Sequence, residues 1–183
     1  MKIEIGRDWS EFLRLLISHR VRFVLVGGHA VAGHGEPRLT ADLDVFVDAT
    51  PTNARRLREV LTEFGFGDSA PSARELSERG KIWMLGRKPW RIDILTLIDG
   101  VTFRQAWQGH VEVPFDPAPL PVIGLAELLR NKRAAGRPKD LADVAALEAL
   151  RADRAARAAP PRRTPKPTAA RSKAKARRRR PPP

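Results

Sequence analysis

Two aspartates placed two residues apart give the clearest chemical signal in this chain. Asp42 and Asp44 alternate with Leu43 and Val45 in a strand-like run. Since residues i and i+2 of a strand share a face, at roughly 7 Å, both carboxylates face one site. A third acid, Asp93, alternates with apolar neighbours in a later run. If the two runs lie side by side, three carboxylates converge, enough to hold two divalent cations about 4 Å apart for phosphoryl chemistry.

The oxygen-rich character of this set predicts the metal. Mg²⁺ suits carboxylate ligands, and Mn²⁺ is the alternative. A zinc site is poorly supported, because the chain has no cysteine and four histidines. We therefore expect two Mg²⁺ ions as cofactors.

A pair of glycines precedes the aspartates. Gly27 and Gly28 follow an apolar run, and thirteen residues separate them from Asp42. Glycine has no Cβ to hold phosphate oxygens away, and a helix opening at 30–32 would offer N-terminal amides to an anion. The pair predicts contact with a triphosphate, although a Gly-Gly after a strand is more often a simple turn.

The order and spacing of these motifs resemble the signature of the DNA polymerase β-type nucleotidyltransferase superfamily. More narrowly, four segments resemble the small bacterial nucleotidyltransferases grouped with AbiE-type toxins of toxin-antitoxin systems. These segments are Gly27-Gly28-His29-Ala30-Val31, His34-Gly35, Arg38-Leu39-Thr40-Ala41-Asp42-Leu43-Asp44 and Arg137-Pro138-Lys139-Asp140. The likeness covers about residues 20 to 150.

The resemblance implies a role for each matching residue. The catalytic, metal-holding residues would be Asp42, Asp44 and Asp93. The nucleotide-binding residues would be Gly27, Gly28, His29, Arg38, Thr40, Lys132 and Lys139. Among these, His29 would line the pocket, and Lys132 or Lys139 would neutralise the triphosphate. The alternative for the two lysines is a solvated turn in which they pair with Asp140 and Asp143.

The elements needed to position these residues can be predicted from periodicity. Apolar residues at helical spacing over 9–17 predict an amphipathic helix, followed by strands over 22–26 and 43–47. A helix after Thr50-Pro51 and a hairpin of 81–85 with 90–98 follow. A helical turn over 103–107 and an edge strand over 110–115 come next, and prolines 114, 117, 119 and 121 are expected to end regular structure there. Helices are predicted over 125–135 and 141–151. The expected fold is α/β (α+β), a small mixed sheet with flanking helices.

The positive charge is concentrated at one end. Of the 34 Lys and Arg residues, eleven lie in 157–183, a segment with no acid and seven prolines. We expect a nucleotidyltransferase domain over 1–156, with a helical C-terminal part over 123–156, and a disordered tail over 157–183. Its charge predicts that the tail binds nucleic acid in a salt-sensitive way. The alternative is a solvated tail that only keeps the protein soluble.

Composition also bears on location and partners. No apolar run reaches the length of a membrane span, and the N-terminus lacks the apolar core of a signal peptide. We expect a cytoplasmic protein without a membrane partner.

Three functions remain open. The first is a toxin that transfers a nucleoside monophosphate from an NTP to an RNA hydroxyl and has a cognate antitoxin. The second is a nucleotidyltransferase for small antibiotic-type acceptors, and the third is a noncatalytic nucleic-acid-binding module. Asp93 is the candidate general base, and water is its competitor.

Overall fold

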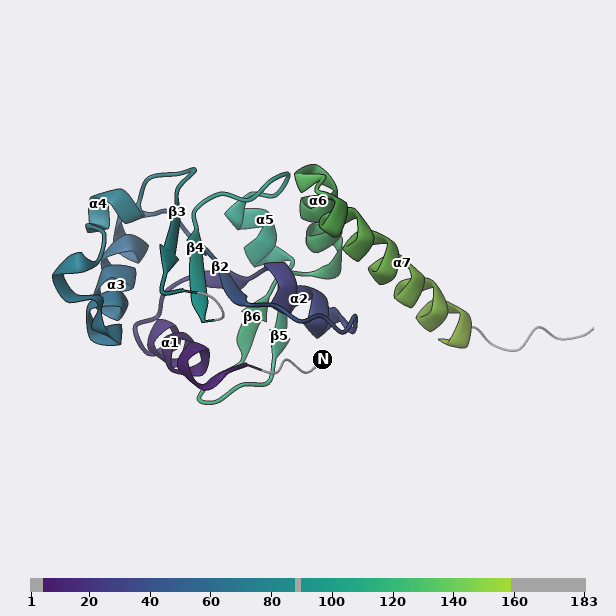
Figure 1. The fold of residues 1–183 in the computed structure, drawn as a ribbon, viewed down its shortest axis with the longest axis horizontal. Helices are drawn as coiled ribbons and strands as arrows, with labels where there is room; N and C mark the ends of the chain where they lie inside the picture. The colour runs from purple at the N-terminus through teal and green to yellow at the C-terminus, as the bar shows by residue number, and fades with distance from the viewer. Residues whose placement is uncertain (1–4, 88–89, 159–183) are drawn as a thin grey trace, which may run out of the picture.

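The computed structural model describes residues 5–87 and 90–158, which build a six-stranded mixed sheet with helices around it (Figure 1). The strand order is β3-β4-β2-β1-β6-β5. The strands are β1 (Phe23–Leu25), β2 (Asp42–Val47), β3 (Ile82–Leu85), β4 (Arg91–Leu95), β5 (Val111–Val113) and β6 (Leu120–Val122). The predicted fold class is confirmed.

The centre of the sheet carries the chemistry predicted above. Strands β2 and β4 run parallel, and Asp44 lies opposite Asp93 in the register. Along β2, Leu43 and Val45 are buried on the face opposite to the aspartates. The alternation seen in the sequence therefore places the acids of both strands on the same face.

The helices are α1 (Arg7–Ser18), α2 (Gly27–His34), α3 (Pro51–Leu61), α4 (Ala73–Leu76), α5 (Phe103–Gln108), α6 (Leu125–Ala135) and α7 (Pro138–Ala158). In Figure 1, α3 and α4 lie to the left of the strands, α1 lies below them, and α6 and α7 lie to the right. The predicted amphipathic helix is confirmed, since Trp9, Phe12, Leu13 and Leu16 of α1 are buried. Helix α3 begins as expected, with the Thr50 side chain accepting a hydrogen bond from the Asn53 amide and Pro51 in the first turn.

The hairpin that positions Asp93 is also confirmed. Strands β3 and β4 are antiparallel neighbours, and Met84 lies opposite Asp93. Since β3 is at the edge of the sheet, it leaves Ile82 and Met84 exposed beside the aspartates.

The prediction that the proline cluster ends regular structure is wrong. Pro121 lies inside β6, which runs parallel to β1 and antiparallel to β5. A proline cannot donate a ladder hydrogen bond, but the neighbouring Ile123 N–H donates to the Leu25 carbonyl at 2.9 Å. Leu120 and Val122 point into the core, and this burial outweighs the missing donor.

The C-terminal helical pair is longer than predicted. Helix α6 has the expected bounds, but α7 begins at Pro138 and continues to Ala158, so the first two residues of the predicted tail are helical. The rest of the tail, 159–183, lies outside the described residues. Within the described part of the chain, no helix is long and apolar enough to cross a membrane.

Candidate active site

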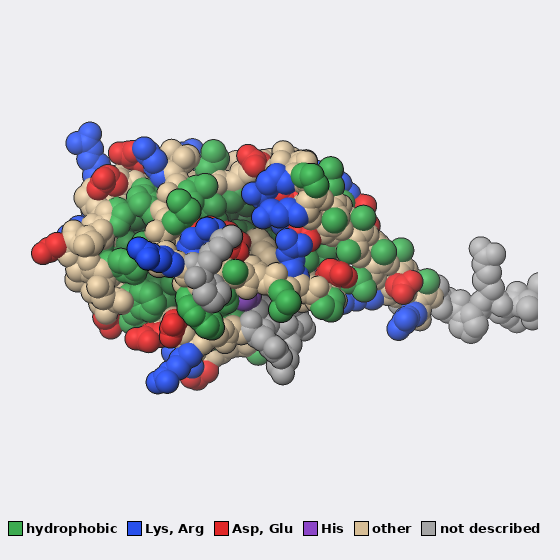
Figure 2. All heavy atoms as spheres, in the orientation of Figure 1, with side chains coloured by type: hydrophobic (Ala, Val, Ile, Leu, Met, Phe, Trp, Pro, Cys, Tyr) green, Lys and Arg blue, Asp and Glu red, His purple; other side chains and the backbone are tan. Residues whose placement is uncertain are grey.

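A cleft of about 560 Å³ opens beside the carboxylate-bearing strands, within the size range of small-ligand sites. Its lining includes the β1–α2 turn, the ends of β2 and β4, and the α6–α7 turn. Figure 2 shows a hollow on this face, with basic side chains gathered toward α6 and α7 and hydrophobic ones over the β3 side. The cleft therefore has a cationic wall and an apolar wall, with the carboxylates between them.

Asp42, Asp44 and Asp93 all line the cleft, as the alternation predicted. Burial, and after it the negative charges of Asp42 and Asp93, raise the pKa of the Asp44 carboxyl to about 6. Lys132 and Lys139 oppose the rise. Among the described residues, no hydrogen bond or ion pair reaches the Asp44 carboxylate. When ionised, Asp44 is therefore a buried carboxylate that lies near two other negative charges and forms no ion pair with a described residue.

Replacing Asp44 by asparagine should therefore stabilise the metal-free protein at neutral pH. The folded carboxyl keeps its proton up to about pH 6, whereas the unfolded one ionises near pH 4, so wild-type stability falls as the pH rises through this window. We expect Asp44→Asn to gain about 2 to 3 kcal/mol at pH 7.5, in EDTA, and almost nothing at pH 4. Denaturant titrations at the two pH values measure this difference, and an equal gain at both would contradict it.

Arg91 lies directly between the other two acids. Its Nη2 donates to Asp42 at 2.8 Å and to Asp93 at 2.7 Å, and its Nε donates to Asp93 at 2.7 Å. These contacts raise the pKa of Arg91, chiefly through the hydrogen bond to Asp93. Sequence reasoning assigned no role to this residue, although its position two before Asp93 places it on the same face of β4.

The glycine pair forms the turn from β1 into α2. Gly27 has φ of 63°, and a Cβ at this position would overlap the Asp44 carboxylate. A Cβ on Gly28 would lie 2.8 Å from Thr40, whose hydroxyl donates to an Asp42 carboxylate oxygen at 2.8 Å. The backbone of the turn therefore lies directly against the acids, as close approach to a phosphate would require.

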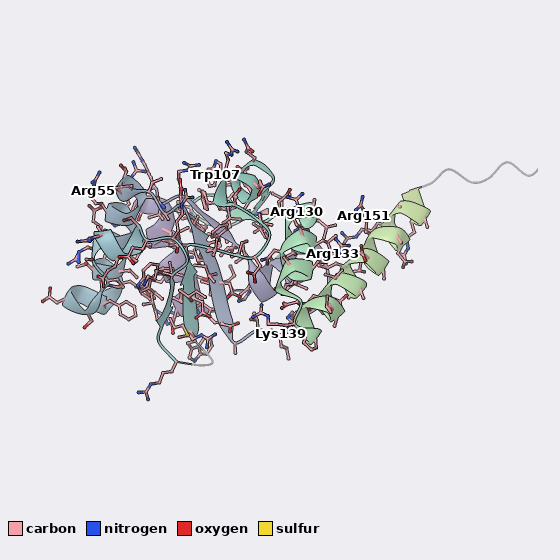
Figure 3. The ribbon with its side chains drawn as sticks, turned by 90° about the horizontal axis from the view of Figure 1, so that it is seen from above. Arg55, Trp107, Arg130, Arg133, Lys139 and Arg151 are labelled. Carbon is pink, nitrogen blue, oxygen red and sulfur yellow. The ribbon has the colours of Figure 1, made fainter. Side chains whose placement is uncertain are left out.

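The cationic wall comes from the α6–α7 turn. Lys132 is buried, and its Nζ contacts Asp140 at 2.7 Å and Asp143 at 2.9 Å. Arg38 also pairs with Asp143, and Arg137 pairs with Asp140. Lys139 is exposed at the start of α7 (Figure 3), and no ion pair joins it to another described residue.

A comparison with protein families shows to which family the chain belongs. The model described as "Nucleotidyl transferase AbiEii toxin, Type IV TA system" matches residues 14–180. The chain belongs to this family. The AbiEii assignment makes the protein a nucleotidyltransferase of the toxin type found in type IV toxin-antitoxin systems, and it confirms the resemblance noted in the sequence. No curated protein matches the chain.

The carboxylate-lined cleft described above brings together nine of the ten predicted site residues, and His29 is the exception. The nine are Gly27, Gly28, Arg38, Thr40, Asp42, Asp44, Asp93, Lys132 and Lys139. His29 is buried behind the turn, edge-on to Trp9 with 5.0 Å between ring centroids, and burial lowers its pKa. It packs in the core and does not line the cleft.

Lys132 also differs from the expectation for a phosphate-binding lysine. Its charge is already matched by two buried carboxylates, so moving it to a nucleotide would break two buried ion pairs and leave Asp140 and Asp143 with one arginine each. The structure thus gives Lys132 the pairing with Asp140 and Asp143 that the sequence left open as the alternative. Lys139 is the lysine with its charge available to a ligand.

Carboxylate oxygens are suitable ligands for a divalent cation, and the three aspartates line the same cleft. Their side chains do not yet have the arrangement of a metal site. Among the described residues, no group of three acid or histidine side chains is arranged to hold a metal ion. The guanidinium of Arg91 shows that Asp42 and Asp93 can share one cation, since it contacts both. Asp42, Asp44 and Asp93 are therefore the residues that would hold a metal after a change of side-chain contacts.

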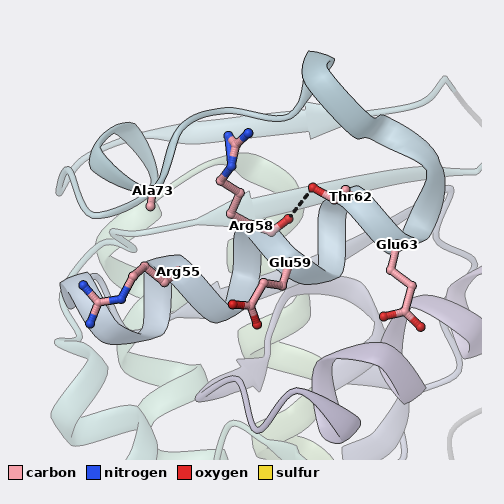
Figure 4. Close-up of a pocket in the computed structure, with 6 residues that line it drawn as sticks. All are labelled: Arg55, Arg58, Glu59, Thr62, Glu63 and Ala73. Carbon is pink, nitrogen blue, oxygen red and sulfur yellow. Dashed lines mark hydrogen bonds between the residues drawn. The ribbon is translucent and has the colours of Figure 1, made fainter.

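A second hollow over α3 lacks comparable chemistry. It is lined by Arg55, Arg58, Glu59, Thr62, Glu63 and Ala73 (Figure 4). The Thr62 hydroxyl donates to the Arg58 carbonyl at 3.0 Å, and both glutamates pair with His19. The two glutamates of this hollow are paired with a histidine, and its described lining residues include no set of three carboxylates, so the carboxylate cleft is the candidate active site.

Proposed function

We propose that this toxin transfers a nucleoside monophosphate from an NTP to a hydroxyl of RNA, with Mg²⁺ or Mn²⁺ as cofactor. The observation that carries the proposal is the convergence of Asp42, Asp44 and Asp93 beside the Gly27–Gly28 turn, inside a cleft with one cationic wall. The metal ions would neutralise the phosphates and polarise the reacting oxygens. An NTP substrate and a cognate antitoxin are the partners that the family suggests.

The proposed reaction is a displacement at phosphorus. The acceptor oxygen bonds to the α-phosphorus, the bond to the bridging oxygen of the β-phosphate breaks, and pyrophosphate leaves. The acceptor proton passes to Asp93 or to water. Positioning by the turn and charge neutralisation by the cationic wall supply most of the acceleration.

The apolar wall favours RNA over an antibiotic-type acceptor. Ile82 and Leu97 line the cleft, and each residue is 56% exposed. Such a surface suits the flat face of an unpaired base, whereas a polycationic small molecule needs acids. Beyond the three central aspartates, Asp99 is the one acid among the described lining residues. The noncatalytic alternative is disfavoured by the family and by the intact set of carboxylates.

The basic tail would add affinity for the acceptor. Residues 159–183, outside the described residues, contain ten of the Lys and Arg residues predicted to contact phosphates. We propose that the tail holds RNA near the cleft in the cytoplasm and that the cleft selects the reacting hydroxyl.

Lys139→Ala should weaken NTP binding about ten- to a hundredfold, because a charge-assisted contact to phosphate is worth roughly 1.5 to 3 kcal/mol. Calorimetry with a non-hydrolysable NTP and Mg²⁺ measures the change. Arg133→Ala is the matched control, since Arg133 lies on the same helical pair but forms an ion pair with Glu148 outside the cleft. Equal affinities of wild type and Lys139→Ala would remove the proposed role.

The acceptor can be tested with total bacterial RNA and a panel of aminoglycosides, each mixed with Mg²⁺ and one α-labelled NTP at a time. We expect label in an RNA band with the full chain, and reduced labelling at high salt. Label on an aminoglycoside and none on RNA would support the second function instead.

A further inference from the structure

The guanidinium of Arg91 occupies the place between two of the carboxylates that the proposed function assigns to metal binding. Its three hydrogen bonds to Asp42 and Asp93 span 2.7 to 2.8 Å, within the range of strong charge-assisted bonds. The side chain is 23% exposed, compared with 11% for Asp93, so the contacts are largely shielded from solvent. This is a bridging ion pair in the centre of the cleft.

We propose that Arg91 is a positioning residue that holds Asp42 and Asp93 together in the metal-free protein, and that a divalent cation must displace its guanidinium in order to bind. The inference rests on the proposed function for the identity of the metal-binding residues. It goes beyond that function because it assigns Arg91 an antagonistic role toward the metal. If Arg91 had a purely structural role, removing it would not raise the affinity of the carboxylates for a metal ion.

The charge balance of the cleft explains why such a residue is needed. Three carboxylates on neighbouring strands repel one another, and Asp44 has no counter-ion among the described residues. Lys132, the nearest buried cation, is bound to Asp140 and Asp143. Arg91 therefore supplies the positive charge that keeps Asp42 and Asp93 aimed at a common point until a metal ion replaces it.

The geometry also requires that the two cations exclude each other. Arg91 Nη2 contacts Asp42 and Asp93 at once, and Nε takes the other oxygen of Asp93. Both Asp93 oxygens thus accept hydrogen bonds from Arg91. A metal ion shared by Asp42 and Asp93 would have to take the position of Nη2, which contacts both carboxylates, so the loss of these hydrogen bonds lowers the affinity of the free protein for metal.

The test is the affinity of the full-length protein for Mn²⁺, without NTP or RNA, measured by electron paramagnetic resonance of free Mn²⁺. Arg91→Gln removes the competing charge, and we expect it to bind Mn²⁺ about tenfold more tightly than wild type. Arg91→Lys keeps a charge but cannot bridge both carboxylates with a planar fork, so we expect a smaller gain. Adding Asp42→Asn to Arg91→Gln should abolish the gain, which would place the bound ion at the carboxylates.

Arg22→Gln is the matched control. Arg22 also forms an ion pair with an aspartate at 2.8 Å, Asp48, but neither residue lines the cleft. Its Mn²⁺ affinity should equal that of wild type.

Melting curves in EDTA identify any variant that fails to fold, and Arg91→Lys keeps the test decisive if Arg91→Gln does not. Mn²⁺ affinities of folded Arg91 variants equal to or weaker than wild type would overturn the inference. The Mn²⁺ titration does not depend on turnover, so it tests the role of Arg91 separately from the proposed function. If the Arg91 variants gain Mn²⁺ affinity but the labelling experiment detects no nucleotide transfer, the role of Arg91 is supported and only the proposed function is contradicted.

Discussion

Asp44→Asn should lower nucleotide transfer by about a thousandfold, because a carboxylate that helps to bind the metal ions supports several kcal/mol of transition-state stabilisation. Asparagine has nearly the same shape but no negative charge, so the cleft keeps its form. The same variant should melt about 4 to 10 °C higher than wild type at pH 7.5 in EDTA, since it removes the crowded anion. Initial rates of label transfer and melting curves on the same preparation measure both effects.

The combination of the two effects is more specific than either one. A variant that lost activity through misfolding would melt at a lower temperature, and a residue outside the active site would keep its activity. Wild-type turnover in purified Asp44→Asn would refute the assignment of this carboxylate to the active site. A lowered melting temperature would refute the view that Asp44 is an uncompensated charge in the metal-free protein.

Gly27→Ala should lower transfer about a hundredfold, the effect expected when a catalytic group is displaced by about 1 Å. The new methyl group would overlap the Asp44 carboxylate, so either the turn or the aspartate must shift. The positive φ of 63° adds roughly 1 to 2 kcal/mol of backbone strain for a residue with a Cβ. Steady-state rates with saturating NTP show the loss in turnover.

Gly65→Ala separates strain from displacement. Gly65 also has a positive φ, of 105°, but a Cβ there has no heavy atom within 4 Å, and it is not among the residues that line the cleft. This variant should be destabilised and yet retain the wild-type turnover below its melting temperature. Equal losses of turnover in the two variants would show that strain, and not displacement of Asp44, is responsible.

Local patterns were sufficient to predict the centre of the molecule. Alternation along β2 and β4 depends on strand geometry alone, so Asp42 and Asp44 could be placed on one face of their strand, and Asp93 on the face of its own strand that is opposite to its apolar neighbours. The register that puts Asp44 opposite Asp93 is a tertiary fact, and it fulfils the condition on which the sequence argument depended. The bounds of α6 followed in the same way from helical periodicity and a terminal glycine.

The features that escaped prediction depend on contacts between distant segments. Arg91 could be assigned to the face of Asp93, but its contact with Asp42, 49 residues earlier, depends on the pairing of β2 with β4. His29 follows directly on the glycine pair in the sequence, yet its packing against Trp9 of α1 takes it away from the cleft. Strand β6 was missed because burial of its neighbours overrides the local preference of Pro121.

The most direct test of the proposed activity is to compare α-labelled with γ-labelled NTP, using the full chain, Mg²⁺ and total bacterial RNA. We predict that the α-label enters RNA, that the γ-label is released as pyrophosphate, and that neither occurs with Asp42→Ala/Asp44→Ala. Transfer of the γ-label to RNA would indicate a kinase-type reaction, and transfer of α-label by the double variant would show that these carboxylates do not catalyse it. Either result would contradict the account given for this cleft.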